Sequence, residues 1–273
     1  MRALLEACGT ALAELRRQQP LIHCLTGHVT INDSANGVLA CGGRPIMSEH
    51  PAEAAEVTSV ARALVLNLNN ISDSRMEAMR ASAPTAQRLG LPITLDPVGV
   101  TCSTLRREFA RELVQQKFPT ILRGNLSEIR VMAGLSCRNA GIDAGDAMEP
   151  ADIGRMVKEL ARQQGFVVVA TGAVDVISDG KQTVGIHNGT PLLGSVTGTG
   201  CLCGAMTGAY SAVAEPFVAA VTATLAMGVA GELAQRVMER ETAGMGTFKT
   251  ALFDALWQLD GKILSRHARL EQL

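Results

Sequence analysis

Val196-Thr197-Gly198-Thr199-Gly200-Cys201-Leu202-Cys203-Gly204 is the stretch around which the chain is organised. An apolar, strand-like run at 192–196 enters it and a helical pattern of small residues leaves it, so it predicts a strand, a glycine turn and a helix N-terminus. The first N–H groups of such a helix have no partner within it and point, with the positive end of the helix dipole, at one place. Anions, most often phosphates, bind there. We therefore expect residues 198–201 to surround an anion.

Two other interpretations of this stretch stay open from the residues alone. Gly198, Gly200 and Gly204 match the loose spacing of a dinucleotide-binding loop, but that loop requires a βαβ unit with an acidic residue about 20 positions on. Here the chain turns all-helical instead. The plainest interpretation is a tight turn followed by a buried cysteine, Cys201, because free cysteine packs like a small apolar residue. No G-x-x-x-x-G-K-[ST] sequence occurs, which excludes a P-loop.

Composition disfavours several classes of function. The 273 residues are 47% hydrophobic, enough for a large core, and we expect one domain over residues 1–273. With 25 basic and 26 acidic residues, the net charge of -1 lacks the basic excess typical of proteins that bind nucleic acid. Aromatic residues are only 3%, which argues against a stacking platform for bases.

The cysteines and the apolar segments point to the cytoplasm. Seven cysteines, an odd number without a C-x-x-C pair, are typical of reduced thiols. Residues 1–20 predict an amphipathic helix and lack the apolar core of a signal peptide. Residues 182–214 contain no Asp, Glu, Lys or Arg, but Pro191 and several glycines interrupt them. We therefore expect buried interior there, no membrane span, and a cytoplasmic protein.

Short apolar runs alternate with helical patterns along the chain. The expected strands are 45–47, 63–67, 92–95, 119–122 and 166–170. The expected helices are 3–18, 32–41, 74–89, 105–115, one beginning near Leu126, 150–163, 202–213, 216–238 and 247–267. Residues 174–178 and 182–187 flank Asp179-Gly180, which predicts an antiparallel hairpin at one sheet edge. The pattern is that of an α/β fold: a mostly parallel sheet covered by helices on both faces.

In an open parallel sheet, ligands bind beyond the carboxyl ends of the strands. The residues expected at those ends are mostly polar or glycine: Met47, Asn67, Asp96, Arg123-Gly124-Asn125, Thr171-Gly172 and Thr197-Gly198. Asp96, together with Glu128 in the first turn of the next helix, is suited to hold Mg²⁺ near a phosphate. Each carboxylate is equally suited to a turn or to a helix N-terminus. Arg123 ends a buried strand and therefore needs an anion, either a phosphate or a structural carboxylate.

Seven motifs carry a family resemblance, and they span nearly the whole chain. They are His23-Cys24-Leu25-Thr26, Ala35-Asn36-Gly37, Pro45-Ile46-Met47, Leu95-Asp96-Pro97-Val98-Gly99, Arg123-Gly124-Asn125-Leu126-Ser127-Glu128-Ile129, Thr171-Gly172 with Val174-Asp175, and Val196-Thr197-Gly198-Thr199-Gly200-Cys201. In this order they resemble the hydroxyethylthiazole kinase family, which belongs to the ribokinase-like kinases. Each motif is weak by itself, but the joint match is specific.

The resemblance implies a ribokinase-like fold and ATP-dependent phosphorylation of the hydroxyl of 4-methyl-5-(2-hydroxyethyl)thiazole, a salvage step toward thiamine. It places the thiazole near Met47 and Gly198. ATP is expected near Arg123, Asn125 and Thr171, and Mg²⁺ near Asp96 and Glu128. It further implies a homotrimer with the thiazole site between neighbouring subunits, for which the small-residue segment 217–231 is a compatible contact.

Cys201 stands where ribokinase relatives usually carry an aspartate that acts as base. A helix N-terminus lowers the pKa of a thiol, so Cys201 is a candidate acceptor for the substrate proton. Phosphoryl transfer depends mostly on positioning and charge stabilisation, however. We therefore expect the amides of Gly198, Thr199, Gly200 and Cys201 to matter more than the thiol.

The chain departs from the family pattern at three places. Gly27 stands where Asn is usual, Asn69-Asn70 where Gly-Thr is usual, and Ala173 where Glu commonly follows Thr-Gly. These changes leave the exact alcohol open, with a hydroxymethylpyrimidine as the nearest alternative. A nucleotide-binding sensor without catalysis and a dinucleotide-dependent oxidoreductase are the alternatives from other classes.

Overall fold

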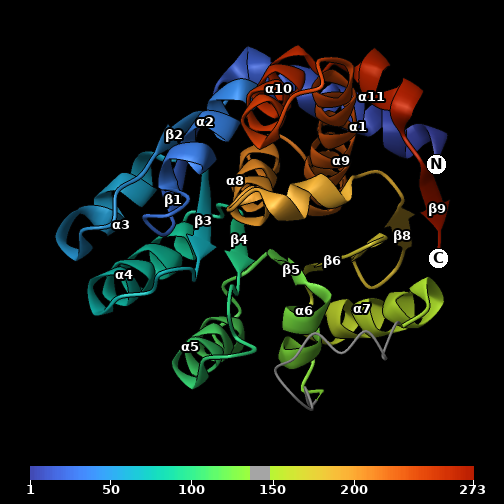
Figure 1. Ribbon diagram of the computed structural model, residues 1–273. Coiled ribbons are helices and arrows are strands. Elements are labelled where there is room, and N and C mark those ends of the chain that lie inside the picture. The colour runs from blue at the N-terminus through green and yellow to red at the C-terminus, as the bar shows by residue number, and fades with distance from the viewer. Residues whose placement is uncertain (136–147) are drawn as a thin grey trace.

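A nine-stranded mixed sheet runs through the molecule, with helices on both faces (Figure 1). The computed structural model describes residues 1–135 and 148–273. The strand order is β2-β1-β3-β4-β5-β6-β7-β8-β9. The strands are β1 (Leu21–Leu25), β2 (Arg44–Ile46), β3 (Ala63–Asn67), β4 (Ile93–Asp96), β5 (Ile121–Asn125), β6 (Val167–Thr171), β7 (Asp175–Ser178), β8 (Thr183–Ile186) and β9 (Leu270–Gln272).

The sheet changes from parallel to antiparallel after β6. Strands β2, β1, β3, β4, β5 and β6 are all parallel, and the apolar runs of β3 and β6 are buried on both faces. The predicted hairpin is confirmed: β7 and β8 pair antiparallel around Asp179, whose Oδ1 accepts hydrogen bonds from the backbone of Lys181 and Gln182, 2.8 Å each. Strand β9, which the sequence pattern did not predict, extends this edge antiparallel to β8.

Two helical layers cover the sheet, as expected for the α/β fold. The helices are α1 (Arg2–Gln18), α2 (Ile31–Cys41), α3 (Pro51–Val60), α4 (Asp73–Arg88), α5 (Thr104–Gln115), α6 (Leu126–Met132), α7 (Pro150–Gln164), η1 (Pro191–Ser195, a 3-10 helix), α8 (Thr199–Ser211), α9 (Pro216–Arg240), α10 (Met245–Gln258) and α11 (Gly261–His267). Helices α1, α2, α8, α9, α10 and α11 lie on one face, and α4 to α7 on the other (Figure 1).

Helix α9 is the most deeply buried long helix of the first layer. It is long and apolar enough to cross a membrane by length and composition, but 83% of its most apolar window is buried inside the molecule. Its small-residue segment, 217–231, packs within the chain's own core. The burial of this segment is therefore explained without a subunit contact.

Two predicted elements are wrong in detail. The run at 192–196 before the glycine turn is not a strand but the 3-10 helix η1, because Pro191 fixes its backbone and the Thr190 side chain caps it. The single helix expected at 247–267 is two helices, α10 and α11. The break comes at Asp260, whose side chain accepts a hydrogen bond from the backbone N–H of Ile263 (2.7 Å) and starts a new helix.

Candidate functional site

The start of α8 forms the centre of the site. Gly198 has a left-handed backbone with φ of 91°, which turns the chain into the helix, and the Leu202 N–H donates to the Gly198 carbonyl at 2.8 Å. The amides of Thr199, Gly200 and Cys201 therefore belong to the first turn, where helix geometry supplies no partner. A Cβ on Gly198 would lie 2.7 Å from Thr30 Cγ2, whereas a Cβ on Gly200 would meet nothing within 4 Å.

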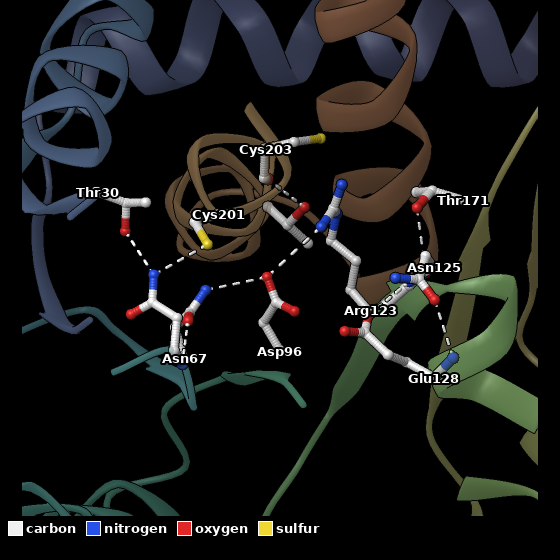
Figure 2. A network of polar contacts seen from close by, with 12 residues as sticks. Thr30, Asn67, Asp96, Arg123, Asn125, Glu128, Thr171, Cys201 and Cys203 are labelled. Carbon is white, nitrogen blue, oxygen red and sulfur yellow. Dashed lines mark hydrogen bonds and ion pairs between the residues drawn. The ribbon is translucent and has the colours of Figure 1, made fainter. Parts of the chain in front are cut away.

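The ends of three neighbouring strands face this helix start. Asn67, Asp96 and Arg123 lie near the ends of β3, β4 and β5, and all three are buried. Asn67 Nδ2 donates to Asp96 Oδ2 at 3.1 Å, and Arg123 Nη1 lies 3.5 Å from the same oxygen (Figure 2). A Cβ on Gly204 would come 3.0 Å from that oxygen as well, so α8 passes directly over Asp96.

Burial decides the charge state of Asp96. Loss of hydration raises the pKa of Asp96 from 3.8 to about 7; the nearby guanidinium of Arg123 lowers it and the carboxylate of Glu128 raises it. The carboxyl group therefore keeps its proton to a higher pH than an exposed aspartate does. A cation bound beside it would favour the charged form.

Glu128 uses both carboxylate oxygens in local hydrogen bonds. Its Oε2 accepts from the backbone N–H of Asn125 and its Oε1 from that of Gly99, both at 2.9 Å. The Asn125 side chain accepts in turn from the Glu128 N–H, which completes a capping box at the start of α6. The described residues contain no group of three His, Cys, Asp or Glu side chains that could hold a metal.

Asp96 and Glu128 nevertheless fit the kind of site that Mg²⁺ uses in phosphoryl-transfer proteins. That ion keeps several waters and is commonly held by one or two carboxylates together with phosphate oxygens. Burial disfavours the negatively charged form of Asp96, and a cation bound beside it would stabilise that form. Glu128 is engaged by two amides, so it suits a contact through the ion's water shell. Their role as metal ligands stays a prediction.

A pocket of about 620 Å³ opens beside the helix start, on the side of β5 and β6. The predicted residues Arg123, Asn125, Thr171, Thr199 and Gly200 all line it. Arg123 Nε is buried without a hydrogen-bond partner among the described residues, which leaves a cationic donor for an anion. The pocket therefore brings together the residues predicted to bind the nucleotide. The predicted thiazole residues Met47 and Gly198, like Asp96 and Cys201, do not line it.

The opposite wall of this pocket was not predicted from the sequence. The loop between β8 and η1 and one face of α9 supply it, through His187, Asn188, Gly189, Thr190, Pro191, Leu193, Gly194, Thr224, Met227 and Gly228. The available signal was the charge-free run 182–214, which we interpreted as buried interior. That interpretation is wrong for residues 187–194, because they border an open pocket.

Cys201 lies on the other side of Asp96 from the pocket residues Asn125 and Thr171 (Figure 2). Its Sγ accepts a hydrogen bond from Asn69 Nδ2 at 3.2 Å, and only 9% of the residue is exposed. Burial, and then the charge of Asp96, raises the pKa of the Cys201 thiol above its ordinary value. The direction is opposite to the lowering expected at a helix start, because burial is the largest cause of the shift.

Two of the departures from the family pattern meet in this region. The Asn69 side chain occupies the space above Gly27, where a Cβ would be 1.8 Å from Asn69 Oδ1. The third departure, Ala173, lies in the wall of the large pocket. Met47 follows β2 and is half-buried against the core, while Gly198 lines a small cavity of about 10 Å³ with Thr197 and Leu202.

The architecture is shared with solved proteins of low sequence identity. A ribokinase-like superfamily protein from Enterococcus faecalis V583, 11% identical, superposes with a TM-score of 0.61 over 91% of this chain and 93% of that one. The chain therefore has the ribokinase-like fold, and its strand ends and helix start lie where ligands bind in such open sheets.

Closer relatives narrow this class to one family. A family model described as the hydroxyethylthiazole kinase family matches residues 12–262. Hydroxyethylthiazole kinase of Ruminiclostridium cellulolyticum is 40% identical over 264 residues, 96% of each chain. The structure of hydroxyethylthiazole kinase protein from Pyrococcus horikoshii OT3 is 32% identical, with a TM-score of 0.87 over 100% of both chains. The chain belongs to the hydroxyethylthiazole kinase family.

Proposed function

We propose that the protein transfers the terminal phosphoryl group of ATP to the hydroxyl of 4-methyl-5-(2-hydroxyethyl)thiazole, in thiamine salvage. Family membership supports the reaction class and the thiazole alcohol. The α8 start lies between the 620 Å³ pocket, which Arg123 lines, and the buried Cys201 with its hydrogen-bond partner Asn69. This position is the observation that carries the proposal. A phosphate at this helix start would have a nucleotide on one side and an alcohol on the other.

On the nucleotide side, the 620 Å³ pocket has the size of a site for one small ligand. Its charge pattern suits a nucleoside triphosphate, because Arg123 and the amides of Thr199 and Gly200 supply donors at one end. Asn125 and Thr171 border the same end, where β5 and β6 stop. We place the phosphates there and the nucleoside toward the walls formed by the 187–194 loop and α9.

Asp96 and Glu128 would hold Mg²⁺ beside the phosphates. When bound, the ion neutralises negative charge on the phosphate oxygens as the phosphoryl group is transferred. Asp96 supplies the buried carboxylate, which Asn67 fixes through the 3.1 Å hydrogen bond. Glu128 holds the Asn125 and Gly99 amides and so fixes the loops on both sides of this position.

On the acceptor side, we place the thiazole alcohol near Met47 and Gly198 with its hydroxyl toward the helix start. The amides of residues 198–201 stabilise the transferring group, which is the larger contribution to such a reaction. Cys201 is the side chain at the helix start that would accept the hydroxyl proton, but burial raises its pKa and so favours the neutral thiol. Positioning therefore contributes more to catalysis than the thiol does.

We further propose a cytoplasmic homotrimer whose acceptor site is completed by a neighbouring subunit. The cavity that Gly198 lines within one chain is about 10 Å³, too small for a thiazole, which supports a site shared between subunits. Light scattering of the purified protein measures the mass directly. A trimer supports this assembly, and a monomer that phosphorylates the thiazole at full rate contradicts it.

The decisive experiment measures ADP release from ATP and Mg²⁺ with a panel of small alcohols. We expect the hydroxyethyl thiazole to give the highest kcat/KM. A hydroxymethylpyrimidine is the second candidate, because Gly27 and Asn69 alter the contacts beside Cys201. Nucleotide binding without turnover on any alcohol would instead indicate a sensor, and binding of NAD in place of ATP would indicate an oxidoreductase.

A further inference from the structure

Asn69 lies in the loop after β3, and four hydrogen bonds hold it in place. Its Nδ2 donates to Thr30 Oγ1 at 2.8 Å and to Cys201 Sγ at 3.2 Å. Its backbone N–H donates to Asn67 Oδ1 at 2.9 Å, and its carbonyl accepts from Arg75 Nη1 at 2.6 Å. Thr30, which precedes α2, and Cys201, in the first turn of α8, therefore meet at this one side chain although they are far apart in the sequence.

The Asn69 side chain occupies a space that is open only because residue 27 is a glycine. A Cβ on Gly27 would lie 1.8 Å from Asn69 Oδ1, 2.7 Å from its Cγ and 2.8 Å from its carbonyl oxygen. Non-bonded atoms do not approach each other this closely, so any larger residue at position 27 displaces the Asn69 amide. The two residues form one fitted pair across the β1 and β3 loops.

The amide orientation is set by its donors. Oδ1 is buried and has no hydrogen-bond partner within the described ranges, while Nδ2 donates both of the side-chain hydrogen bonds described above. Leaving a buried oxygen unpaired is costly. The amide is held in this orientation because Thr30 and Cys201 receive its two N–H groups.

Thr30 transmits this restraint to the glycine turn. Its Cγ2 packs so closely on Gly198 that a Cβ there would be 2.7 Å away, and its Oγ1 accepts from Asn69. Asn69 thus fixes both Cys201 and, through Thr30, Gly198. Neither Asn69 nor Thr30 lines the 620 Å³ pocket, so the restraint acts only on the side away from the proposed nucleotide.

We propose that Asn69, seated at Gly27, is a positioning residue that sets the geometry of the acceptor side of the α8 start through Thr30 and Cys201. The proposal rests on the phosphotransfer function given above for the part that concerns the alcohol. It assigns Asn69 no contact with the reacting atoms. Its effect is to hold the glycine turn and the Cys201 thiol in position beside the place that the acceptor hydroxyl must occupy.

The first experiment removes the two donors and compares the kinetic constants for the two substrates. Asn69→Ala and Asn69→Asp, which has the same shape without N–H groups, are expected to lower kcat/KM for the alcohol by at least about tenfold. The KM for ATP and the affinity for ADP should stay within about twofold. Asn70→Gly is the matched control, because Asn70 is the exposed neighbour and already has a φ of 43°. It should change nothing.

The second experiment tests the fitted pair. Gly27→Ala should reduce activity and melting temperature, because its Cβ collides with the Asn69 side chain. Adding Asn69→Gly should restore part of the melting temperature, because only the 2.8 Å contact with the residue 69 carbonyl remains, but not kcat/KM, since the donors are still missing. The exchange Gly27→Asn with Asn69→Gly returns an amide to the same space from the other loop, and should recover kcat/KM after a small shift of the 69 carbonyl.

A crystal structure of Asn69→Ala separates this proposal from the proposed function. A displaced Thr30 and a shifted Gly198 turn are the expected result, whichever alcohol the enzyme uses. An unmoved turn, or a kcat/KM equal to that of the unaltered protein, overturns the proposal. If no alcohol is phosphorylated by the unaltered protein, the proposed function fails, and the crystal structure still decides whether Asn69 positions the turn.

Discussion

The two sides of the α8 start differ in packing, although they share one backbone turn. Toward β5 and β6, a pocket of about 620 Å³ reaches Thr199 and Gly200, and a Cβ on Gly200 would touch nothing. Toward β1 and β3, Gly198 lies against Thr30, and the Asn69 side chain fills the space above Gly27. The side proposed for the nucleotide is therefore open in a single chain, whereas the side proposed for the acceptor is closely packed.

This difference teaches that the two glycines of the turn have different tasks. Gly198 is required by its positive φ and by the approach of Thr30, so it is a matter of backbone geometry. Gly200 is unhindered in the chain, so its lack of a side chain matters only when a ligand approaches. Substitutions on each side should consequently affect different kinetic constants.

The largest effect is expected from Gly198→Ala. A positive φ and a Cβ 2.7 Å from Thr30 Cγ2 force the turn to move, which misplaces the amides at the phosphate; we expect kcat to fall by about 10³-fold. Steady-state ADP release measures it. Gly200→Ala is the matched comparison: it should leave the melting temperature unchanged and mainly raise the KM for ATP. Equal losses of stability in both variants would break the comparison.

Arg123→Met comes next, because it removes the cation of the nucleotide side and retains an unbranched side chain. We expect kcat/KM for ATP to fall by about 10²-fold, as for loss of one charged donor at a transferring phosphate. Isothermal titration with ADP should show weaker binding, while the KM for the alcohol stays near that of the unaltered protein. A change confined to the alcohol would place the nucleotide elsewhere.

Asp96→Asn should alter stability in a pH-dependent way. Burial raises the pKa of Asp96 from 3.8 to about 7, so the folded state holds its proton more tightly than the unfolded state. The free energy of unfolding therefore decreases as pH rises from about 4 to about 7. The uncharged variant avoids this loss of stability. Its melting temperature should exceed that of the unaltered protein by roughly several °C at pH 8, but should not exceed it at pH 4.

Melting curves without nucleotide, recorded between pH 4 and pH 8, test this expectation. Asp254→Asn, which changes an exposed carboxylate on α10, is the control and should follow the unaltered protein. A pH-independent difference between Asp96→Asn and the unaltered protein would mean that the carboxyl group stays charged in the folded state. The same variant should lose activity, because a neutral side chain attracts Mg²⁺ poorly.

The smallest effect is expected from Cys201→Ala. Burial keeps the thiol neutral, so its removal should lower kcat by less than about tenfold and leave measurable turnover. Single-turnover measurements on both proteins give the rate of the chemical step. Complete loss of turnover with unchanged alcohol binding would show that the thiol, and not the backbone amides, dominates the acceptor side.

Much of the sheet could be predicted from sequence because its physical signal is local. The apolar runs of β3 and β6 and the Asp179-Gly180 turn each identify their element without reference to the rest of the chain. Strand β9 was not predicted because it has only three residues and exists through its pairing with β8, which is distant in the sequence. The helix expected over 247–267 divides at Asp260 for a local reason, the cap that the Asp260 side chain forms with the Ile263 N–H, and the periodicity of the segment did not reveal it.

The candidate site divides in the same way. The strand-end rule brought Asp96 and Arg123 together correctly, since parallel strands end at one edge of a sheet. It did not predict that residues 187–194 form a wall of the pocket, because a loop's path depends on what it packs against. It also gave no hint that Gly27 and Asn69, 42 positions apart, share one space.

The sequence by itself determined the alternation of most strands and helices, the glycine turn before α8, and the set of polar residues at the strand ends. These follow from hydrophobic periodicity and from the conformations that glycine and proline allow, which neighbouring residues fix. Only the tertiary structure decided that burial raises the pKa of Asp96, that Glu128 accepts from the Gly99 N–H in addition to capping its own helix, and that Asn69 donates to Cys201. Desolvation and hydrogen-bond partners are set by groups far away in the chain, so no local pattern contains them.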